Sequence, residues 1–184
     1  MADDKRKINK EQAKEEQEFY EKLVQATDEL LSHGLEEYPH IYSDGSYDKK
    51  TDHYGYSTII IFPDGRDPYI RYGKGTHGVD NGWQVNGEVA GIMLGLQALA
   101  DAGYKHMVVN YDLKNIELWA NGVWQAKKTY SIRYREYVSK LRSQGIEILF
   151  EKVKAHSGNK YNEWADFYAK KGLGITKHDN LGAM

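Results

Sequence analysis

Four acidic residues of this 184-residue chain stand where distant segments would meet if the expected elements fold together. Asp44 falls in an expected first strand, Glu88 at the expected start of a long helix, Asp112 directly after a short buried-type strand, and Asp166 on the expected last helix. Converging carboxylates repel one another unless cations neutralise them. Two Mg²⁺ ions about 3.5–4 Å apart, held by such oxygen ligands, form a site for phosphoryl transfer. The pattern therefore predicts a metal-dependent site acting on phosphate esters.

Each acid also has an ordinary explanation when it is taken alone. Glu88 and Asp112 could serve the first turn of a helix, where a negative charge is favoured by roughly 0.3–1 kcal/mol. Asp44, which precedes a Gly, could be a turn residue. Asp166 fits such an explanation less well, because its aromatic and small neighbours indicate a packed helix. A zinc site is disfavoured, since the chain has no Cys and no close His pair.

The helices and strands that position these acids are predicted from the spacing of apolar residues and from the Gly, Pro and Asp residues that separate the segments. Short segments rich in Ile and Tyr, separated by Asp, Gly and Pro, predict three successive strands, and helical spacing with a terminal Gly predicts the helix that follows. The expected strands are 40–47, 54–62, 68–75, 106–110 and 146–153, and the expected helices are 88–102, 112–119, 131–144 and 162–171. This order predicts an α/β fold with a mixed five-stranded sheet, three antiparallel strands followed by parallel additions, flanked by helices.

Charge divides the chain unevenly, although the net charge is only -2. Residues 1–38 have a net charge of -5 and residues 39–184 one of +3. An apolar face over about 12–32 predicts a helix in the first segment. We expect an acidic helical N-terminal arm over 1–38, a catalytic domain over 39–175 and a flexible tail over 176–184. The arm is expected to pack on the domain; contact with a protein partner or a second copy of the chain, and a mostly frayed tail, stay open as alternatives.

Several classes of protein are excluded by composition. The absence of Cys excludes disulfide scaffolds and thiol nucleophiles. No apolar run approaches the roughly 20 residues that span a bilayer, so no membrane partner is expected and the protein is expected to be cytoplasmic. The net charge of -2, taken alone, argues against a nucleic-acid partner, but residues 113–160 have a net charge of +6.

That basic stretch mixes aromatic residues with positive charge. Trp124, Lys127 and Lys128 are expected to contact a nucleic-acid backbone. Trp119 is expected to pack in the core. Lys140 and Arg142 are expected to form a solvated helix face.

At these positions the chain resembles the type 1 ribonuclease H family, over about 41–172. Residues 42–46 (YSDGS) are similar to the family's first-strand motif, and 86–88 (NGE) with the apolar helix that follows are similar to its glutamate-bearing helix. Residues 153–158 (VKAHSG) and 162–166 (NEWAD) are the most specific stretch. A single motif is weak, whereas all of them in this order and spacing are strong.

The resemblance implies a ribonuclease H-like fold and hydrolysis of the RNA strand of RNA–DNA hybrids, leaving 5′-phosphate and 3′-hydroxyl ends. It implies that Asp44, Glu88, Asp112 and Asp166 hold two Mg²⁺ ions, for which Mn²⁺ could substitute. It makes His156 a mobile loop histidine that assists proton transfer or product release. The residues expected to contact the hybrid are Gly45, Ser46, Asn86, Trp124, Lys127, Lys128, Lys154 and Asn162.

The chain departs from the family pattern in two places. Leu113 and Lys114 follow Asp112 where many members have Ser, and 84–86 (QVN) matches only partly the Asn pair that commonly precedes the glutamate. The arm does not resemble the small hybrid-binding domain of some members. Two other functions stay open: a DNA nuclease on the same fold, and a catalytically silent module that binds hybrids.

Overall fold

The computed structural model describes residues 10–11, 13–18, 21, 37–76, 82–153 and 160–174. The strands are β1 (His40–Asp48), β2 (His53–Ile61), β3 (Tyr69–Thr76), β4 (His106–Tyr111) and β5 (Glu147–Lys152). The helices are α2 (Trp83–Asp101), α3 (Asn115–Ala120), α4 (Thr129–Ser143) and α5 (Lys160–Gly172). The predicted order of elements is confirmed. The helix expected over about 12–32 lies largely outside the described residues, although 13–18 are helical.

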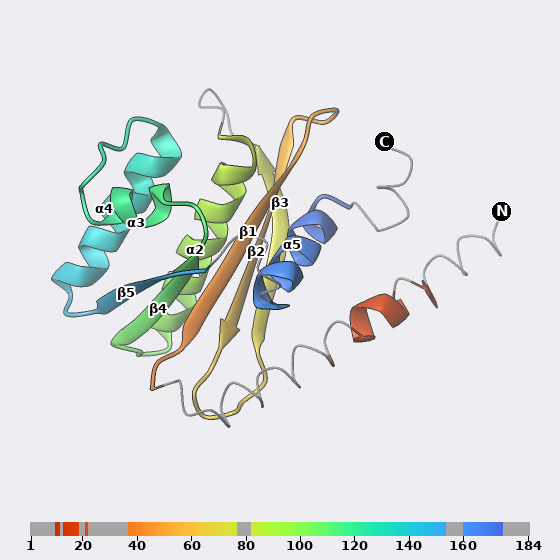
Figure 1. Ribbon diagram of the computed structural model, residues 1–184, viewed down its shortest axis with the longest axis horizontal. Helices are drawn as coiled ribbons and strands as arrows, with labels where there is room; N and C mark the ends of the chain where they lie inside the picture. Colours follow the sequence, from red (N-terminus) through yellow and green to blue (C-terminus); the bar gives the residue numbers. More distant parts are fainter. Residues whose placement is uncertain are drawn as a thin grey trace.

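The five strands form one mixed sheet in the order β3-β2-β1-β4-β5 (Figure 1). β2 pairs antiparallel with β1 and with β3, whereas β4 pairs parallel with β1 and with β5. The predicted sheet, three antiparallel strands followed by parallel additions, is confirmed. β1 is the central strand, with two strands on each side, so it is the most firmly held element of the sheet.

Helices cover both faces of this sheet, and each face has its own core (Figure 1). On one face α2 and α4 enclose a core that includes Ile41, Leu96, Val109 and Tyr134. On the other face α5 packs over Tyr42, among other residues, in a second core cluster. Successive residues of β1 therefore point to opposite cores, as the alternation of a strand requires. In the described part of the chain no helix is long and apolar enough to cross a membrane.

Helix α2 begins at Trp83, five residues before the predicted start, so the prediction that Glu88 opens the helix is wrong. Asn86 and Gly87 are weak helix formers, which is why the sequence indicated a later start. Contact with the sheet overrides that preference. A Cβ atom added to Gly87 would lie 2.1 Å from the carbonyl oxygen of Gly55 on β2, so only glycine permits this close approach.

Candidate active site

The four predicted acids come from four different elements. Asp44 lies in the middle of β1, opposite Ser57 of β2. Glu88 lies in the second turn of α2 and is buried. Asp112 is an exposed residue in the connection between β4 and α3, and Asp166 lies half-buried on α5. The first-turn explanation therefore fails for Glu88 and for Asp112, because neither lies in the first turn of a helix.

Electrostatic interactions link these four side chains through Asp44 and Glu88. Burial, together with the charges of Asp166 and Asp112 and a side-chain hydrogen bond with Asp166, raises the pKa of Asp44 from 3.8 to about 7, although a hydrogen bond from the Gly45 N–H opposes the shift. Burial, followed by the charges of Asp112 and Asp44, raises the pKa of Glu88 well above its usual value. A chain whose fold concentrates negative charge in this way needs protons or cations to balance it.

A lysine partly balances this charge at one acid. The ammonium group of Lys170 lies 2.8 Å from the Oδ2 atom of Asp166, one helical turn away on α5. Among the described residues, no three acidic or histidine side chains stand at the close spacing of an assembled metal site. The arrangement is thus a cluster of interacting carboxylates with one ammonium group at its edge.

Two buried hydroxyl groups fix the helices that carry two of the acids. The Oγ atom of Ser43, next to Asp44, donates a 2.8 Å hydrogen bond to the carbonyl oxygen of Glu88. The Oγ atom of Ser57 donates a 2.6 Å hydrogen bond to the carbonyl oxygen of Ala165, the residue before Asp166. Sequence reasoning missed both serines. The Ser before Asp44 was visible in the first-strand motif, whereas no local pattern marked the role of Ser57.

The residues predicted to contact substrate near these acids differ in how far they are exposed, and two of them lie outside the described residues. Gly45 adjoins Asp44, but its glycine character is explained by packing: a Cβ atom there would lie 1.8 Å from the carbonyl oxygen of Gln84. Ser46 is half-buried beside it, and Asn86 is buried in α2. Asn162 lies half-buried on α5. Lys154 and His156 lie outside the described residues.

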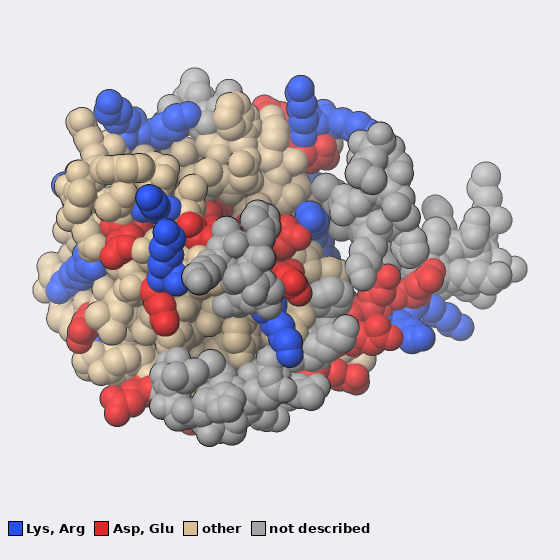
Figure 2. Space-filling view, viewed as in Figure 1, with Lys and Arg blue, Asp and Glu red and all other residues tan. Residues whose placement is uncertain are grey.

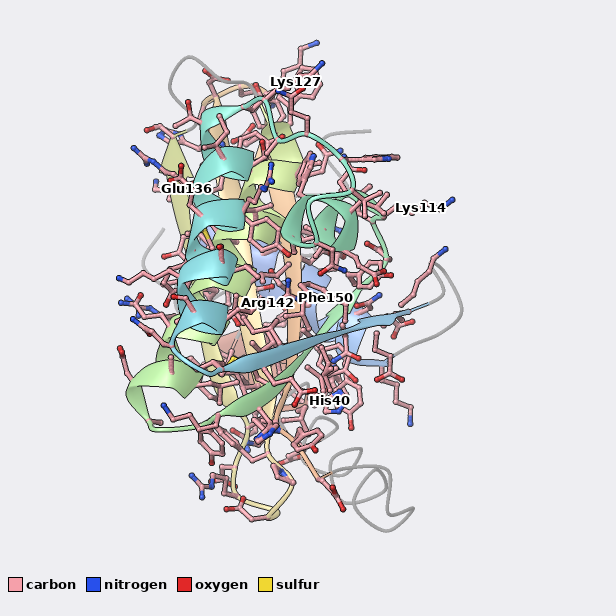
Figure 3. All side chains as sticks on the ribbon, turned by 90° about the vertical axis from the view of Figure 1, so that its left-hand side faces the viewer. His40, Lys114, Lys127, Glu136, Arg142 and Phe150 are labelled. Atoms are coloured by element: carbon pink, nitrogen blue, oxygen red, sulfur yellow. The ribbon has the colours of Figure 1, made fainter. Side chains whose placement is uncertain are left out.

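The basic stretch forms a surface around α3 and α4. Trp124 is 46% exposed in the connection between these helices, and Lys127 and Lys128 follow it there and are exposed. Figure 3 shows the Lys127 side chain at one end of α4 and Lys114 beside α3, both pointing away from the protein. Figure 2 shows further Lys and Arg side chains spread over one face, with acidic side chains near its middle.

Three other residues of the stretch bear on the sequence interpretation. Trp119 packs against the first core and meets the Tyr130 ring edge-on at 6.1 Å, so the expectation of core packing is confirmed. The prediction that Arg142 belongs to a solvated face is wrong. Its guanidinium group donates hydrogen bonds to the carbonyl oxygens of Ala120 and Ile148, at 3.3 and 3.1 Å, and so ties α4 to α3 and β5. Lys140 is exposed, as expected.

Comparisons with known proteins identify the family of this chain. The family model described as RNase H matches residues 36–174, and the chain belongs to this family. A ribonuclease H of Wolbachia is 28% identical over 141 residues, which are 72% of this chain and 93% of that protein.

Solved structures agree on the fold. The structure of RNase H1 from the halophilic archaeon Halobacterium salinarum covers 74% of this chain and 97% of its own, with a TM-score of 0.59 and 19% identity. LC11-RNase H1 in complex with an RNA/DNA hybrid covers 73% of this chain and 99% of its own, with a TM-score of 0.53 and 17% identity. At such identities the likeness shows the fold.

Proposed function

We propose that this protein is a ribonuclease H, an endonuclease that hydrolyses the RNA strand of RNA–DNA hybrids and leaves 5′-phosphate and 3′-hydroxyl ends. The observation that carries the proposal is the interaction of carboxylates from different elements. Burial, together with the charges of Asp166 and Asp112, raises the pKa of Asp44 to about 7, and burial with the charges of Asp112 and Asp44 raises the pKa of Glu88. Membership of the RNase H family and the hybrid bound to LC11-RNase H1 support the choice of substrate. A module that only bound phosphates would gain nothing from such clustered negative charge.

The donor set fits divalent cations of the hard type. All four candidate ligands are carboxylates, which Mg²⁺ and Mn²⁺ prefer, and the raised pKa of Asp44 marks a place where positive charge would be favourable. Asp44, Glu88, Asp112 and Asp166 would hold two Mg²⁺ ions. When bound, such ions supply an activated water and stabilise charge on the leaving oxygen.

The protein's own part in the reaction is to hold these ligands rigidly. Asp44 sits on the central strand, and its Oδ1 atom accepts a 2.8 Å hydrogen bond from the Gly45 N–H, which fixes the orientation of the carboxylate. The Ser43 and Ser57 hydrogen bonds fix the backbone at Glu88 and just before Asp166. Preorganised groups need no rearrangement when charge develops in the transition state. His156 would move a proton or assist product release.

Hybrid binding would use two surfaces. Gly45, Ser46, Asn86 and Asn162 would contact the cleaved strand next to the acids. The surface of Trp124, Lys127 and Lys128, with Lys154, would contact phosphates by charge and aromatic stacking, without reading the base sequence. Discrimination would rest on the 2′-hydroxyl groups and the groove shape of the hybrid.

Cleavage of end-labelled duplexes tests this proposal. With Mg²⁺ present we expect cuts in the RNA strand of a hybrid, none in a DNA duplex of the same sequence, and none after addition of a chelator. Cutting of the DNA duplex instead would indicate a DNA nuclease on the same fold. Tight binding of the hybrid without any cleavage would indicate a silent binding module.

A further inference from the structure

Trp83 combines two unusual properties at the start of α2. Its side chain is 50% exposed, and its backbone has a φ angle of 48°, a left-handed conformation that bulky residues rarely adopt. The close packing of the preceding residue, Gly82, holds the backbone in place here. Gly82 is buried, and a Cβ atom added to it would lie 2.5 Å from the Tyr130 ring and 3.0 Å from the Cβ atom of Asn86. Strain of this kind gathers at functional sites, where the surrounding structure maintains it.

A second aromatic ring lies beside Trp83. The Tyr47 ring on β1 lies 6.5 Å from the Trp83 ring, centroid to centroid, with the two planes inclined at 55°. The Tyr47 hydroxyl group donates a 2.6 Å hydrogen bond to Asp52 in the turn between β1 and β2. That turn is itself braced, because Asp48 accepts hydrogen bonds from the Lys50 N–H and the Thr51 hydroxyl, both at 3.0 Å. The hydrogen bond and this braced turn hold the Tyr47 ring in position.

This aromatic pair, Tyr47 and Trp83, lies on the same two elements as two of the proposed catalytic acids, Asp44 on β1 and Glu88 on α2. Tyr47 follows Asp44 by three residues on β1, about 10 Å along a strand. Trp83 precedes Glu88 by five residues on α2, about 7.5 Å along a helix. Figure 1 shows that the hairpin of β1 and β2 and the first turn of α2 lie at the same end of the sheet. At about 3.4 Å of rise per nucleotide, these path lengths correspond to roughly two to three nucleotides of a strand that runs along both elements.

We infer that Trp83 and Tyr47 form an aromatic platform that packs against a sugar of the cleaved strand, two to three nucleotides from the scissile phosphate. The inference rests on the proposed function, since it takes the RNA–DNA hybrid as the substrate. In a paired hybrid the base faces are stacked on one another, so a ring that approaches from outside meets the sugars. The wide, shallow minor groove of RNA-like helices exposes these sugars to side chains.

The platform holds the strand in register without taking part in bond breaking. Its contacts are the same in the ground state and in the transition state, so its loss raises KM and leaves kcat nearly unchanged. This split separates the platform from the carboxylates, whose loss lowers kcat.

The test uses Trp83→Gly, because glycine removes the ring and also accepts the left-handed backbone without strain. In an Asp44→Asn background that binds without cleaving, we expect Trp83→Gly to weaken binding of a fluorescently labelled hybrid at least about fivefold, because the apolar contact between ring and sugar is lost. The thermal midpoint should be no lower than that of the parent, because strain is released. Trp83→Phe should retain most of the affinity.

Two controls define the contact. Tyr72 is 38% exposed on the edge strand β3 and packs against the ring of Tyr168, so Tyr72→Leu should leave hybrid binding unchanged. A hybrid that lacks one base of the cleaved strand at the platform, but keeps its sugar, should show the same loss with Trp83→Gly as the intact hybrid. If the loss disappears with the abasic hybrid, the ring contacts a base and the sugar contact is refuted.

The outcomes separate this inference from the proposed function. If the wild-type protein cleaves hybrids and Trp83→Gly binds them as well as the parent does, the platform is refuted and the proposed function stands. If Trp83→Gly lowers the thermal midpoint by several degrees, Trp83 is a structural residue and the platform is likewise refuted. If the wild-type protein neither binds nor cleaves hybrids, the proposed function fails and the platform fails with it.

Discussion

Replacing Asp44 by Asn should stabilise the metal-free protein at alkaline pH, although it removes the central candidate ligand. Asp44 is a charged group that folding buries beside Asp166 and Asp112, and these surroundings raise its pKa from 3.8 to about 7. Asn keeps nearly the same shape, and its carbonyl oxygen can still accept the hydrogen bond from the Gly45 N–H. Asn carries no charge, so the substitution removes both the repulsion from the neighbouring carboxylates and the cost of dehydrating a charged carboxylate.

The magnitude and the pH window follow from the same shift. The folded state holds the Asp44 proton up to a higher pH than the unfolded state does, so the stability of the wild-type protein falls as pH rises from about 4 to about 7. Above that range the loss is complete. A shift from 3.8 to about 7, at about 1.36 kcal/mol per unit, sets an upper figure of about 4 kcal/mol. Because the Asn side chain is itself a polar group that folding removes from water, we expect a smaller gain of about 2 kcal/mol, or about 4–8 °C in Tm.

Thermal unfolding at pH 8 and at pH 4, both with a chelator, measures this gain. Asp44→Asn should melt above the wild-type protein at pH 8, and the difference should shrink at pH 4. Asp64→Asn is the matched control, since the exposed Asp64 is paired with Arg66, which lowers its pKa, so its replacement should give no gain. An Asp44→Asn variant that melts at or below the wild-type temperature at pH 8 would refute the convergence of the acids.

Two further substitutions probe the groups around the acids. Lys170→Met should lower the Mg²⁺ concentration needed to raise Tm, because the ammonium group 2.8 Å from Asp166 competes with the ion. Lys171→Met should leave that concentration unchanged. Equal Mg²⁺ dependence of Tm in both variants would contradict this role of Lys170. Ser57→Ala should lower the free energy of unfolding by about 1 kcal/mol in urea titrations and should also reduce kcat, because its hydrogen bond to Ala165 fixes the backbone next to a proposed ligand. An unchanged kcat would limit Ser57 to stability.

The order of elements was predictable because apolar residues follow different spacings in the strands and in the helices of this chain, and because turn-forming residues separate these segments. The start of α2 was not, because Asn86 and Gly87 oppose a helix locally, while the contact between Gly87 and β2 requires one. The packing of α2 on β2 therefore outweighs the low helix propensity of Asn86 and Gly87.

The acids of the candidate site were predicted from their residue type and from the family motifs. The residues whose hydrogen bonds hold the surrounding backbone in place were not predicted. Ser43 bonds to a carbonyl group 45 residues away, and Ser57 to one 108 residues away, so no sequence window contains both partners. Arg142 was predicted to be solvated because charged helix residues usually are, yet the carbonyl groups of two other elements converge on it. Such contacts arise only when the chain is folded.

Hydrolysis of a hybrid labelled within its RNA strand tests the central claim most directly. With Mg²⁺ in excess, the wild-type protein should release labelled fragments with 5′-phosphate ends, and Asp44→Asn should lose nearly all turnover while it remains folded and still binds the hybrid. Undiminished hydrolysis by Asp44→Asn would contradict the account, because the carboxylate on the central strand would then have no part in the reaction.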